Sequence, residues 1–485
     1  MAASTTTKKK GASDEKAVSD GIKDLKVDDT PLPKSKHLNV LSEFEKSKSK
    51  KSASFVVVGK DWSPPLGDRS SLTLLGHVDA GKSTLMGRLL LDLNVIGART
   101  IEKYRKEAEG MGKASFALAW VMDQRTEERS RGVTIDIATN KFETDNTSFT
   151  ILDAPGHRDF IPNMIAGASQ ADFAILVVDA TTGAFEAGWK GQTREHSLLL
   201  RSMGVSRIIV AVNKLDTVTW SKERFDEIEQ QVCGFLSATG FQPKNISFVP
   251  VSGLHGDNLV KRSANPEASW YAGRTLIEEL EASEPMTRAL DKPLRMTISE
   301  VYRSSTQHPL TISGRLDAGS LQMGDALVIQ PSGEKAYVKA VELDGQAADW
   351  AVAGQNAVLH LSGIDAIHVR PGDVACDARH PPVPCISRFT AKVLAFEVLM
   401  PMQVDVHRGR LHAAARIAAL PALLDKVRGV PLRQNPKIVK PGDVARVEVR
   451  FDDGAGAPLR GVPLETGQRV VLRSGGNTVA AGLLE

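Results

Sequence analysis

The sequence of 485 residues predicts an α/β domain, with a mostly parallel sheet and helices on both faces, followed by two all-β barrel domains. From about Ser71 to Leu280, continuously apolar runs of strand length alternate with amphipathic stretches, as in a parallel sheet buried on both faces. Short alternating strands with Gly, Pro and Asp turns take over after Lys292-Pro293, and a proline cluster at 380–384 marks a second boundary. The predicted parts are a disordered Lys-rich tail (1–52), the α/β domain (53–288) and two barrels (289–382 and 383–485).

Each element has a sequence that justifies it. The predicted strands of the α/β domain are FTILDAP, FAILVVDA, RIIVAVNKLD and ISFVPVSG, and TLIEELEASEP predicts the helix that ends it. The first barrel is expected from RMTISEVY, TISGRLDAG, ALVIQPSGE and AYVKAVEL. The second is expected from FTAKVLAFEV, PGDVARVEVRF and GQRVVLRSGG. One stretch, LHAAARIAALPALLDKV, looks helical in composition and is expected to be a helix or a decorated loop.

Composition restricts the location but not the partners. The 61 basic and 58 acidic residues nearly balance, although residues 1–60 hold 13 Lys and no Arg against 8 acidic residues. That segment is either a solvated tether or a basic arm that touches RNA. Three cysteines without metal-ligand spacing, no apolar run of membrane-span length and no signal peptide predict a cytoplasmic protein with reduced thiols and no membrane partner.

A phosphate-binding loop follows one of the apolar runs. GHVDAGKS matches the spacing G-x-x-x-x-G-K-S and is followed by the helical pattern TLMGRLLLDL. Backbone N–H groups of such a loop surround a phosphate, and the helix that follows adds its dipole. Lys82 is expected to reach the β- and γ-phosphates, and the Ser83 hydroxyl to coordinate Mg²⁺. The expected nucleotide-binding residues of the loop are Gly76, His77, Val78, Asp79, Ala80, Gly81, Lys82, Ser83 and Thr84.

Two further segments follow strands whose carboxyl ends should meet the loop. In DAPGH, Asp153 is expected to hold Mg²⁺ through water, and the Gly156 N–H to contact the γ-phosphate. In NKLD, the Asp216 carboxylate can accept hydrogen bonds from guanine N1–H and the exocyclic amine, which adenine cannot offer. SGL adds a backbone donor opposite the guanine carbonyl. The base-binding residues expected here are Asn213, Lys214, Asp216, Ser252, Gly253 and Leu254.

The segment RTEERSRGVTID lies between the loop and DAPGH. Thr134 within it could coordinate Mg²⁺ only while the γ-phosphate is present. Such a contact turns a segment into an order-to-disorder switch. The alternative is a charged surface loop, and the neighbouring motifs favour the switch.

Together, GHVDAGKST, EERSRGVTIDI, DAPGHRDFIPNMI, GQTREH and NKLD resemble the translational GTPases of the elongation factor 1-alpha family. The resemblance covers the chain from about Phe55 to its end and implies a GTPase domain followed by two β-barrels. It also implies GTP and GDP as ligands with Mg²⁺, and the ribosome as a partner. His157 stands where other GTPases have a glutamine that orients the attacking water, and Val78 and Val133 resemble the apolar gate that restrains it. Hydrolysis is therefore expected to be slow alone and fast on a ribosome, with His157, Lys82 and Thr134 as catalytic residues.

Three branches of the family compete. They deliver aminoacyl-tRNA, a termination factor, or the tRNA-shaped protein Pelota to stalled ribosomes. SFALAWVMDQRTEERSRGVT, VNKLDTVTWSKERFDEI, AADWAVAGQNAVLHLSGID and the end SGGNTVAAGLLE most resemble the third, rescue branch. Degenerate relatives act as adaptors to RNA-decay machinery, but this chain retains the hydrolytic residues. The tail could still carry an adaptor function, and a monomer is expected apart from the partner complex.

Two strand-like runs precede the loop, and only one can lead into it. Between SFVVVG and HVDAGKST lie seventeen residues, Lys60 to Gly76, which recreate a strand and a glycine as SLTLLG. They could be an extra edge strand with a loop, a strand that competes with the first, or translated intron sequence, which we favour. As the chain stands, SLTLLG is expected to fill the strand site and FVVVG to lie exposed or at a sheet edge.

Overall fold

A computed structural model describes Val40, Glu43 and most of the chain from residue 51 onward. The described ranges are 51–58, 80–110, 117–122, 138–145, 147–153, 161–168, 171–189, 192–283, 288–302, 310–343, 345–426, 428–452 and 461–485. All of them belong to one compact unit, Val40–Glu485. Apart from Val40, Glu43 and the first two residues of a strand, the expected tail lies outside these ranges.

The α/β domain is built on one six-stranded sheet in the order β2-β3-β1-β4-β5-β6. Neighbouring strands are parallel except β2, which runs antiparallel to β3 at the edge. The carboxyl ends of the five parallel strands therefore lie along one edge, where ligands of such sheets bind. The strands are β1 (Lys51–Val58), β2 (Ala138–Glu143), β3 (Thr147–Asp153), β4 (Phe173–Asp179), β5 (Ile208–Asn213) and β6 (Ile246–Pro250).

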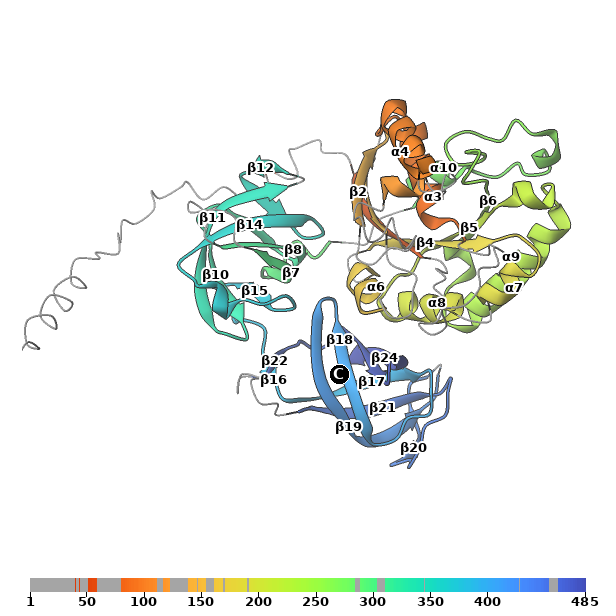
Figure 1. The fold of residues 1–485 in the computed structure, drawn as a ribbon. Helices are drawn as coiled ribbons and strands as arrows, with labels where there is room; N and C mark the ends of the chain where they lie inside the picture. Colours follow the sequence, from red (N-terminus) through yellow and green to blue (C-terminus); the bar gives the residue numbers. More distant parts are fainter. Residues whose placement is uncertain are drawn as a thin grey trace, which may run out of the picture. The chain divides into compact units, whose positions relative to one another are not determined.

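Helices cover both faces of this sheet (Figure 1). On β4, Phe173, Ile175 and Val177 pack with residues of α3, α4 and α10, whereas the alternate residues pack with α6, α7, α8 and α9. Because both faces are buried, the six residues FAILVV at the start of β4 are continuously apolar rather than alternating. The helices are α3 (Lys82–Asp92), α4 (Ala98–Gly110), α6 (Ile161–Ala168), α7 (Ala184–Trp189), α8 (Gln192–Ser202), α9 (Lys222–Ala238) and α10 (Leu276–Glu281), with short 3₁₀ turns η2 (Ala119–Val121), η4 (Leu215–Val218), η5 (Pro243–Asn245) and η6 (Pro266–Ala268).

The next domain is a closed barrel. Six strands follow the order β10-β15-β7-β8-β14-β11, and pairing of β10 with β11 closes the ring. Alternate residues of these strands point into a core of Leu, Ile, Val and Ala, as the alternating sequence predicts. The elements are β7 (Arg295–Tyr302), β8 (Leu310–Ala318), β9 (Ser320–Gln322), β10 (Ala326–Gln330), β11 (Glu334–Leu343), β12 (Gln346–Ala348), β13 (Trp350–Val352), β14 (Asn356–Ser362), η7 (Ala366–His368) and β15 (Val374–Asp377).

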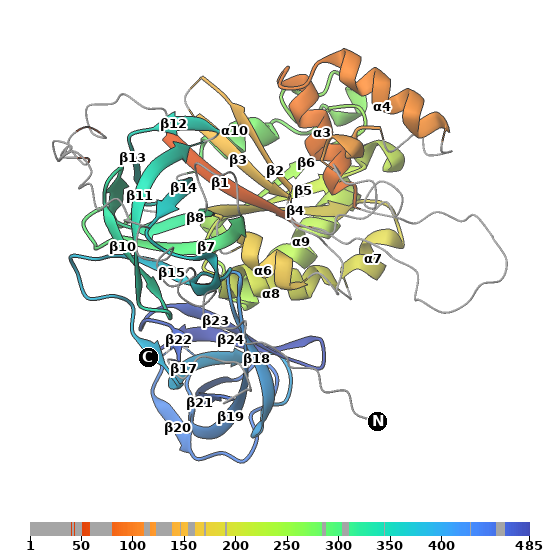
Figure 2. The same ribbon diagram turned by 60° about the vertical axis from the view of Figure 1, so that its left-hand side comes forward.

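A second closed barrel follows (Figure 2). Its strands have the order β18-β23-β24-β17-β21-β19, and pairing of β18 with β19 closes it. The predicted fold class, a P-loop-type α/β domain followed by two barrels, is thus confirmed. The elements are β16 (Cys385–Ile386), β17 (Arg388–Ala395), β18 (Met402–Arg408), β19 (Leu411–Leu424), β20 (Pro431–Gln434), β21 (Val444–Phe451), β22 (Val462–Pro463), β23 (Arg469–Ser474) and β24 (Asn477–Leu484).

The expectation of a helix or decorated loop for LHAAARIAALPALLDKV is wrong. Residues Leu411–Leu424 form the long strand β19, which pairs with β18 on one side and β21 on the other. The alanines favour a helix, but Ala415, Ile417, Leu420, Ala422 and Leu424 are buried in the barrel, with register shifts between them. Cross-strand pairing and burial therefore override local helix propensity.

Two sequence expectations concern membranes and cysteines. Among the described residues, no helix combines the length and apolar character that a membrane crossing requires. Cys233, Cys376 and Cys385 are all free thiols, as expected.

A buried histidine that stacks on an exposed histidine in the second barrel gives a pH-dependent stability. His407 on β18 is 5% exposed, and its ring stacks on that of His412 with centroids 4.7 Å apart. Burial, followed by repulsion from His412 and Arg473, lowers the pKa of His407 to about 4, although Asp405 opposes the shift. The folded state therefore disfavours protonation. Stability from this group is fully present above the unfolded pKa near 6.5 and is lost as pH falls toward 4.

We expect the wild-type protein to lose up to about 3 kcal/mol of unfolding free energy through His407 between pH 7 and pH 4. His407→Gln should remove that part of the pH dependence, because glutamine does not titrate. Denaturant unfolding at several pH values measures it, with exposed His368→Gln in the first barrel as the control. Equal pH dependence in wild type and His407→Gln would contradict the assignment.

Candidate nucleotide site

The described part of the phosphate-binding loop leads directly into a helix. Gly81 precedes α3, which begins at Lys82. Gly81 adopts a left-handed conformation with φ 82°, and a Cβ there would lie 2.6 Å from Asn213 Nδ2. Both the backbone conformation and the close approach require glycine. The first N–H groups of α3 therefore point outward from a tight turn, which is the geometry that binds an anion.

Lys82 occupies an unusual position for a cation. It is 3% exposed and is the first residue of α3, where the helix dipole is positive. Ser83 and Thr84 follow in the same turn and are half-buried. The positive end of a helix dipole does not stabilise a buried ammonium. An anionic phosphate bound at this end compensates the ammonium charge and the positive end of the dipole.

Asn213 joins three of the predicted segments. It is the last residue of β5 and is 2% exposed. Its Nδ2 donates to the Ala80 carbonyl at 2.7 Å, and its Oδ1 accepts from the Gly253 N–H at 2.8 Å. One amide side chain thus holds the phosphate loop and the SGL segment at fixed positions. Both polar atoms of the Asn213 side chain bond to backbone groups of the protein, so its role is to position the two segments of the site.

Lys214 is placed by an ion pair. Its backbone is left-handed, with φ 63°, and its Nζ lies 2.8 Å from Asp179 Oδ2. Asp179 ends β4, is 9% exposed, and also accepts the Thr181 N–H at 2.8 Å. The pair links the carboxyl ends of β4 and β5, which are neighbours in the sheet. Lys214 is therefore held beside the site with its aliphatic stem available to line it.

Asp216 and the SGL segment lie together at the other end of the site. Asp216 is in the turn η4, where the Leu215 N–H donates to the Val251 carbonyl at 3.4 Å. Its carboxylate is partly exposed and lies 3.8 Å from His255 Nε2. Ser252 is fully buried, and its hydroxyl accepts the His255 N–H at 3.3 Å. An acceptor that remains accessible beside backbone donors is what guanine recognition needs.

The remaining predicted residues divide into two groups. Asp153 ends β3, and its backbone pairs with Val57 of β1 at the edge that carries the site. Gly76, His77, Val78, Asp79, Val133, Thr134, Gly156 and His157 lie outside the described residues. The structure thus brings together Ala80, Gly81, Lys82, Ser83, Thr84, Asn213, Lys214, Asp216, Ser252, Gly253 and Leu254.

Sequence reasoning missed Asp179 and Arg88. Asp179 could have been found as the acidic end of FAILVVD, beside the strand that carries NKLD. Arg88 on α3 donates to the Leu254 carbonyl at 3.2 Å and to Asp92 at 2.8 Å. It thereby ties the SGL segment to the helix of the phosphate loop, a long-range contact without a local signal.

The expectation that SLTLLG fills the strand site is wrong. β1, Lys51–Val58, pairs in parallel with β3 on one side and β4 on the other, so FVVV lies in the centre of the sheet (Figure 2). SLTLLG itself lies outside the described residues. The consecutive valines favour a strand more than a run with three leucines does, because β-branched side chains favour extended backbone.

This placement predicts the result of two matched deletions of seventeen residues. Removing residues 60–76 joins Gly59 to His77 and should preserve GTP binding, because β1 remains. It also shortens the connection between Val58 and Ala80 from 21 to 4 residues. Lower loop entropy should then add about 1 kcal/mol to the unfolding free energy.

Removing residues 54–70 keeps SLTLLG as the sole strand-like run and should weaken GTP binding and lower the melting temperature. Thermal unfolding and nucleotide titration compare the two variants. Binding that survives deletion of 54–70 but not of 60–76 would assign the strand to SLTLLG.

A metal ion at this site would need few protein ligands. Among the described residues, no cluster of three His, Cys, Asp or Glu side chains has metal-ligating geometry. Mg²⁺ commonly takes one or two protein oxygens and completes its shell with phosphate oxygens and water. Ser83 in the first turn of α3 and Asp153 at the end of β3 have the oxygen chemistry that fits this ion.

Comparisons with known proteins agree with this geometry. Residues 68–298 match the elongation factor Tu GTP binding domain. The match begins beyond β1 and includes SLTLLG. The two deletions above test the assignment of the first strand to FVVV.

Full-length relatives extend the similarity into the barrels. The chain is 40% identical to protein HBS1 of Drosophila melanogaster over 420 residues, which is 85% of this chain and 62% of that protein. It is 43% identical to elongation factor 1-alpha of Euglena gracilis over 389 residues, covering 78% of this chain and 86% of that protein. The S. cerevisiae Ski7 GTPase-like domain has the same fold at 18% identity, with a TM-score of 0.74 over 92% of this chain and 99% of that one. The chain belongs to the elongation factor 1-alpha family of translational GTPases, which bind GTP and GDP and hydrolyse GTP.

Proposed function

We propose that this protein delivers a tRNA-shaped partner of the Pelota type to stalled ribosomes and leaves it there when GTP is hydrolysed. The observation that carries the GTP-dependent part is the bridge from Asn213 to Ala80 and Gly253, which holds the phosphate and base segments in one site. The rescue role rests on sequence similarity in the barrels and near the switch segment. The domain boundaries at residues 52, 288 and 382 form part of this proposal.

In this site, the residues of the chain position the triphosphate. The N–H groups at the start of α3 and the Lys82 ammonium bind the β- and γ-phosphates. Ser83, Thr134 and Asp153 would hold Mg²⁺, which when bound supplies positive charge to the phosphate oxygens. Asp216 accepts from guanine N1–H and the exocyclic amine, and this excludes adenine.

Hydrolysis requires a water held in line with the bond that breaks. A new bond forms between the water oxygen and the γ-phosphorus, while the bond to the β,γ-bridging oxygen breaks and its electron pair stays with GDP. We assign His157 to orient the water, and Val78 and Val133 to keep His157 away until a ribosome repositions it. We assign Gly156 and Thr134 to the contacts that form only while the γ-phosphate is present. Loss of this phosphate removes those contacts, so the conformation that binds the partner is lost and the partner is released.

The ribosome test uses turnover. GTP hydrolysis by the purified protein should be slow, should rise on addition of ribosomes, and should lose that rise in His157→Ala while GTP binding stays intact. Nucleotide binding without any turnover would favour an adaptor that joins ribosomes to RNA-decay machinery through the tail.

Two observations favour Pelota over other cargo. AADWAVAGQNAVLHLSGID contains β13 and β14, and SGGNTVAAGLLE contains β24. Both stretches resemble the rescue branch, in line with the similarity to protein HBS1. The similarity to elongation factor 1-alpha keeps aminoacyl-tRNA as the second candidate cargo.

A competition pull-down separates the cargo candidates. Tagged protein loaded with a non-hydrolysable GTP analogue should retain a Pelota-type protein and release it with GDP. Retention of charged tRNA or of a termination factor in its place would overturn the rescue role. We also propose that the protein acts in the cytoplasm, where ribosomes translate, and that it is a monomer apart from its complexes.

A further inference from the structure

Arg88 joins the helix of the phosphate loop to the segment that receives the base. It lies on α3 six residues after Lys82, which is about 9 Å further along the helix axis. Its Nη1 donates to the Leu254 carbonyl at 3.2 Å, and its Nε donates to Asp92 Oδ1 at 2.8 Å. The guanidinium group therefore has one carboxylate partner on its own helix and one backbone partner in SGL.

Helix stability alone does not explain this ion pair. Asp92 is the last residue of α3, where the negative end of the helix dipole disfavours a carboxylate. An arginine four residues before an acidic residue is also the less favourable order of such a pair. Both side chains are partly buried, with 28% and 22% of their surface exposed. The pair thus suits a role in fixing the direction of the guanidinium group better than a role in stabilising the helix.

The SGL segment and the turn after it pack closely on the same face of α3. Leu85 lies one turn before Arg88, and a Cβ added to Gly253 would come within 3.0 Å of the Leu85 Cβ. Gly256 has φ 87°, and a Cβ there would lie 2.7 Å from Asp92 Oδ2 and 2.8 Å from Arg88 Nε. Because the backbone of the segment contacts the ion pair directly, a change in the pair must move the segment.

We propose that Arg88 is a positioning residue for guanine selection. Its hydrogen bond directs the Leu254 carbonyl toward α3, so the segment presents backbone N–H groups to the base. Guanine has a carbonyl oxygen, O6, at the position where adenine has an amine. A backbone carbonyl turned toward the base would repel O6 and accept from the adenine amine, so its restraint favours GTP over ATP. This inference rests on the guanine-binding part of the proposed function and adds to it a residue that acts through the protein backbone.

Competition titrations on the full-length protein test this role. Unlabelled GTP, ITP and ATP each displace a fluorescent GTP analogue, and the displacement gives three affinities for each variant. ITP keeps the O6 and N1–H of guanine but lacks the exocyclic amine that donates to Asp216. Arg88→Met should weaken binding of GTP and ITP about five- to tenfold each and change ATP affinity less than about twofold. Equal losses for GTP and ITP place the effect at O6 and not at the amine.

Two more variants of the same pair keep the test independent of folding. Arg88→Lys retains a donor for the Leu254 carbonyl and should restore GTP affinity to within about threefold of wild type. Asp92→Asn removes the carboxylate that orients the guanidinium group and should weaken binding of GTP and ITP about two- to fivefold. The melting temperature of each nucleotide-free variant shows whether the fold is kept.

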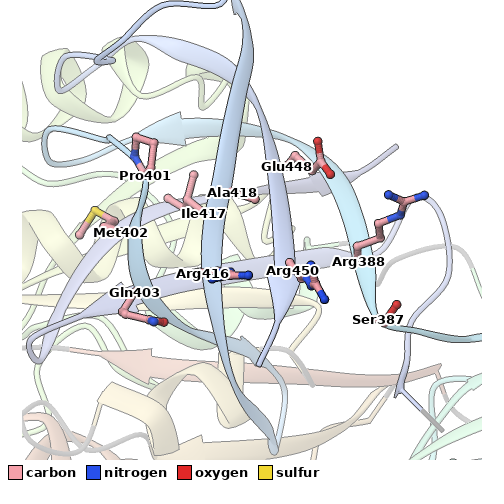
Figure 3. Close-up of a pocket in the computed structure, with 10 residues that line it drawn as sticks. All are labelled: Ser387, Arg388, Pro401, Met402, Gln403, Arg416, Ile417, Ala418, Glu448 and Arg450. Carbon is pink, nitrogen blue, oxygen red and sulfur yellow. The ribbon is translucent and has the colours of Figure 1, made fainter. Parts of the chain in front are cut away.

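Two other arginines serve as matched controls. Arg207 directly precedes β5, at the end of that strand opposite the site, and it also donates to a carboxylate and to a backbone carbonyl, those of Glu279 and Lys244. Arg416 is an exposed arginine on the outer face of the second barrel, so its loss removes the same charge from another domain (Figure 3). Arg207→Met and Arg416→Met should leave the ratio of GTP to ATP affinity within about twofold of wild type.

A loss of equal size for GTP, ITP and ATP in the Arg88 variants would overturn the inference, because Arg88 would then only support the fold. So would a loss confined to GTP, or an unchanged GTP affinity in Arg88→Met. A wild-type protein without preference for GTP over ATP would contradict the guanine site itself, and this inference with it, so the two failures are distinguishable.

Discussion

Replacing Asn213 by alanine is expected to weaken GTP binding at least about tenfold and to lower the free energy of unfolding by about 2–4 kcal/mol. The side chain is buried, and its loss leaves the Ala80 carbonyl and the Gly253 N–H without their partner. The phosphate loop and the base-binding segment would then no longer be held in register. Titration with a fluorescent GTP analogue and denaturant unfolding measure the two effects.

Asn258 provides the matched control. It is also a buried asparagine that joins two backbone groups, donating to the Pro250 carbonyl at 2.9 Å and accepting from the Ser263 N–H at 2.9 Å. Asn258→Ala should cost similar stability and much less GTP affinity. If both variants weaken GTP binding equally, Asn213 has no special role in the site.

Lys82→Met is expected to reduce GTP affinity at least about a hundredfold, because a buried ammonium that meets phosphate contributes several kcal/mol in a water-poor site. The nucleotide-free protein should keep its stability, since a cation at the amino terminus of α3 opposes the helix dipole. Nucleotide titration together with thermal unfolding of the nucleotide-free protein separates these effects.

Lys222→Met is the control for helix position. Lys222 is also the first residue of a helix, α9, but it is exposed. This variant should change neither GTP binding nor stability appreciably. A Lys82→Met protein that unfolds without nucleotide would mean that Lys82 mainly supports the fold.

Much of the fold follows from local sequence because burial and periodicity agree. The first six residues of FAILVVD are apolar, and β4 is buried on both faces. The exceptions are segments whose secondary structure is determined by pairing with strands that are distant in the sequence. β19 is rich in alanine, yet it forms a strand because β18 and β21 enclose it. FVVV and SLTLLG have similar patterns, and only pairing with β3 and β4 separates them.

The sequence predicted which residues belong to the site better than it predicted how their side chains contact one another. Strand-end motifs identified Asn213 and Asp216, because parallel strands bring their carboxyl ends to one edge. Both polar atoms of the Asn213 side chain bond to backbone groups that are forty or more residues away in the chain, and local sequence does not predict these contacts. The ion pair of Lys214 with Asp179 and the contact of Arg88 with Leu254 likewise join elements far apart in the chain.

Base discrimination tests the central claim most directly. Parallel titrations with GTP and ATP should give at least about a hundredfold preference for GTP, because adenine offers no paired donors to the Asp216 carboxylate. In Asp216→Asn, the amide presents a donor to guanine N1–H, and most of that preference should disappear. Equal affinity of the wild-type protein for GTP and ATP would contradict the account of a guanine nucleotide held between Lys82 and Asp216.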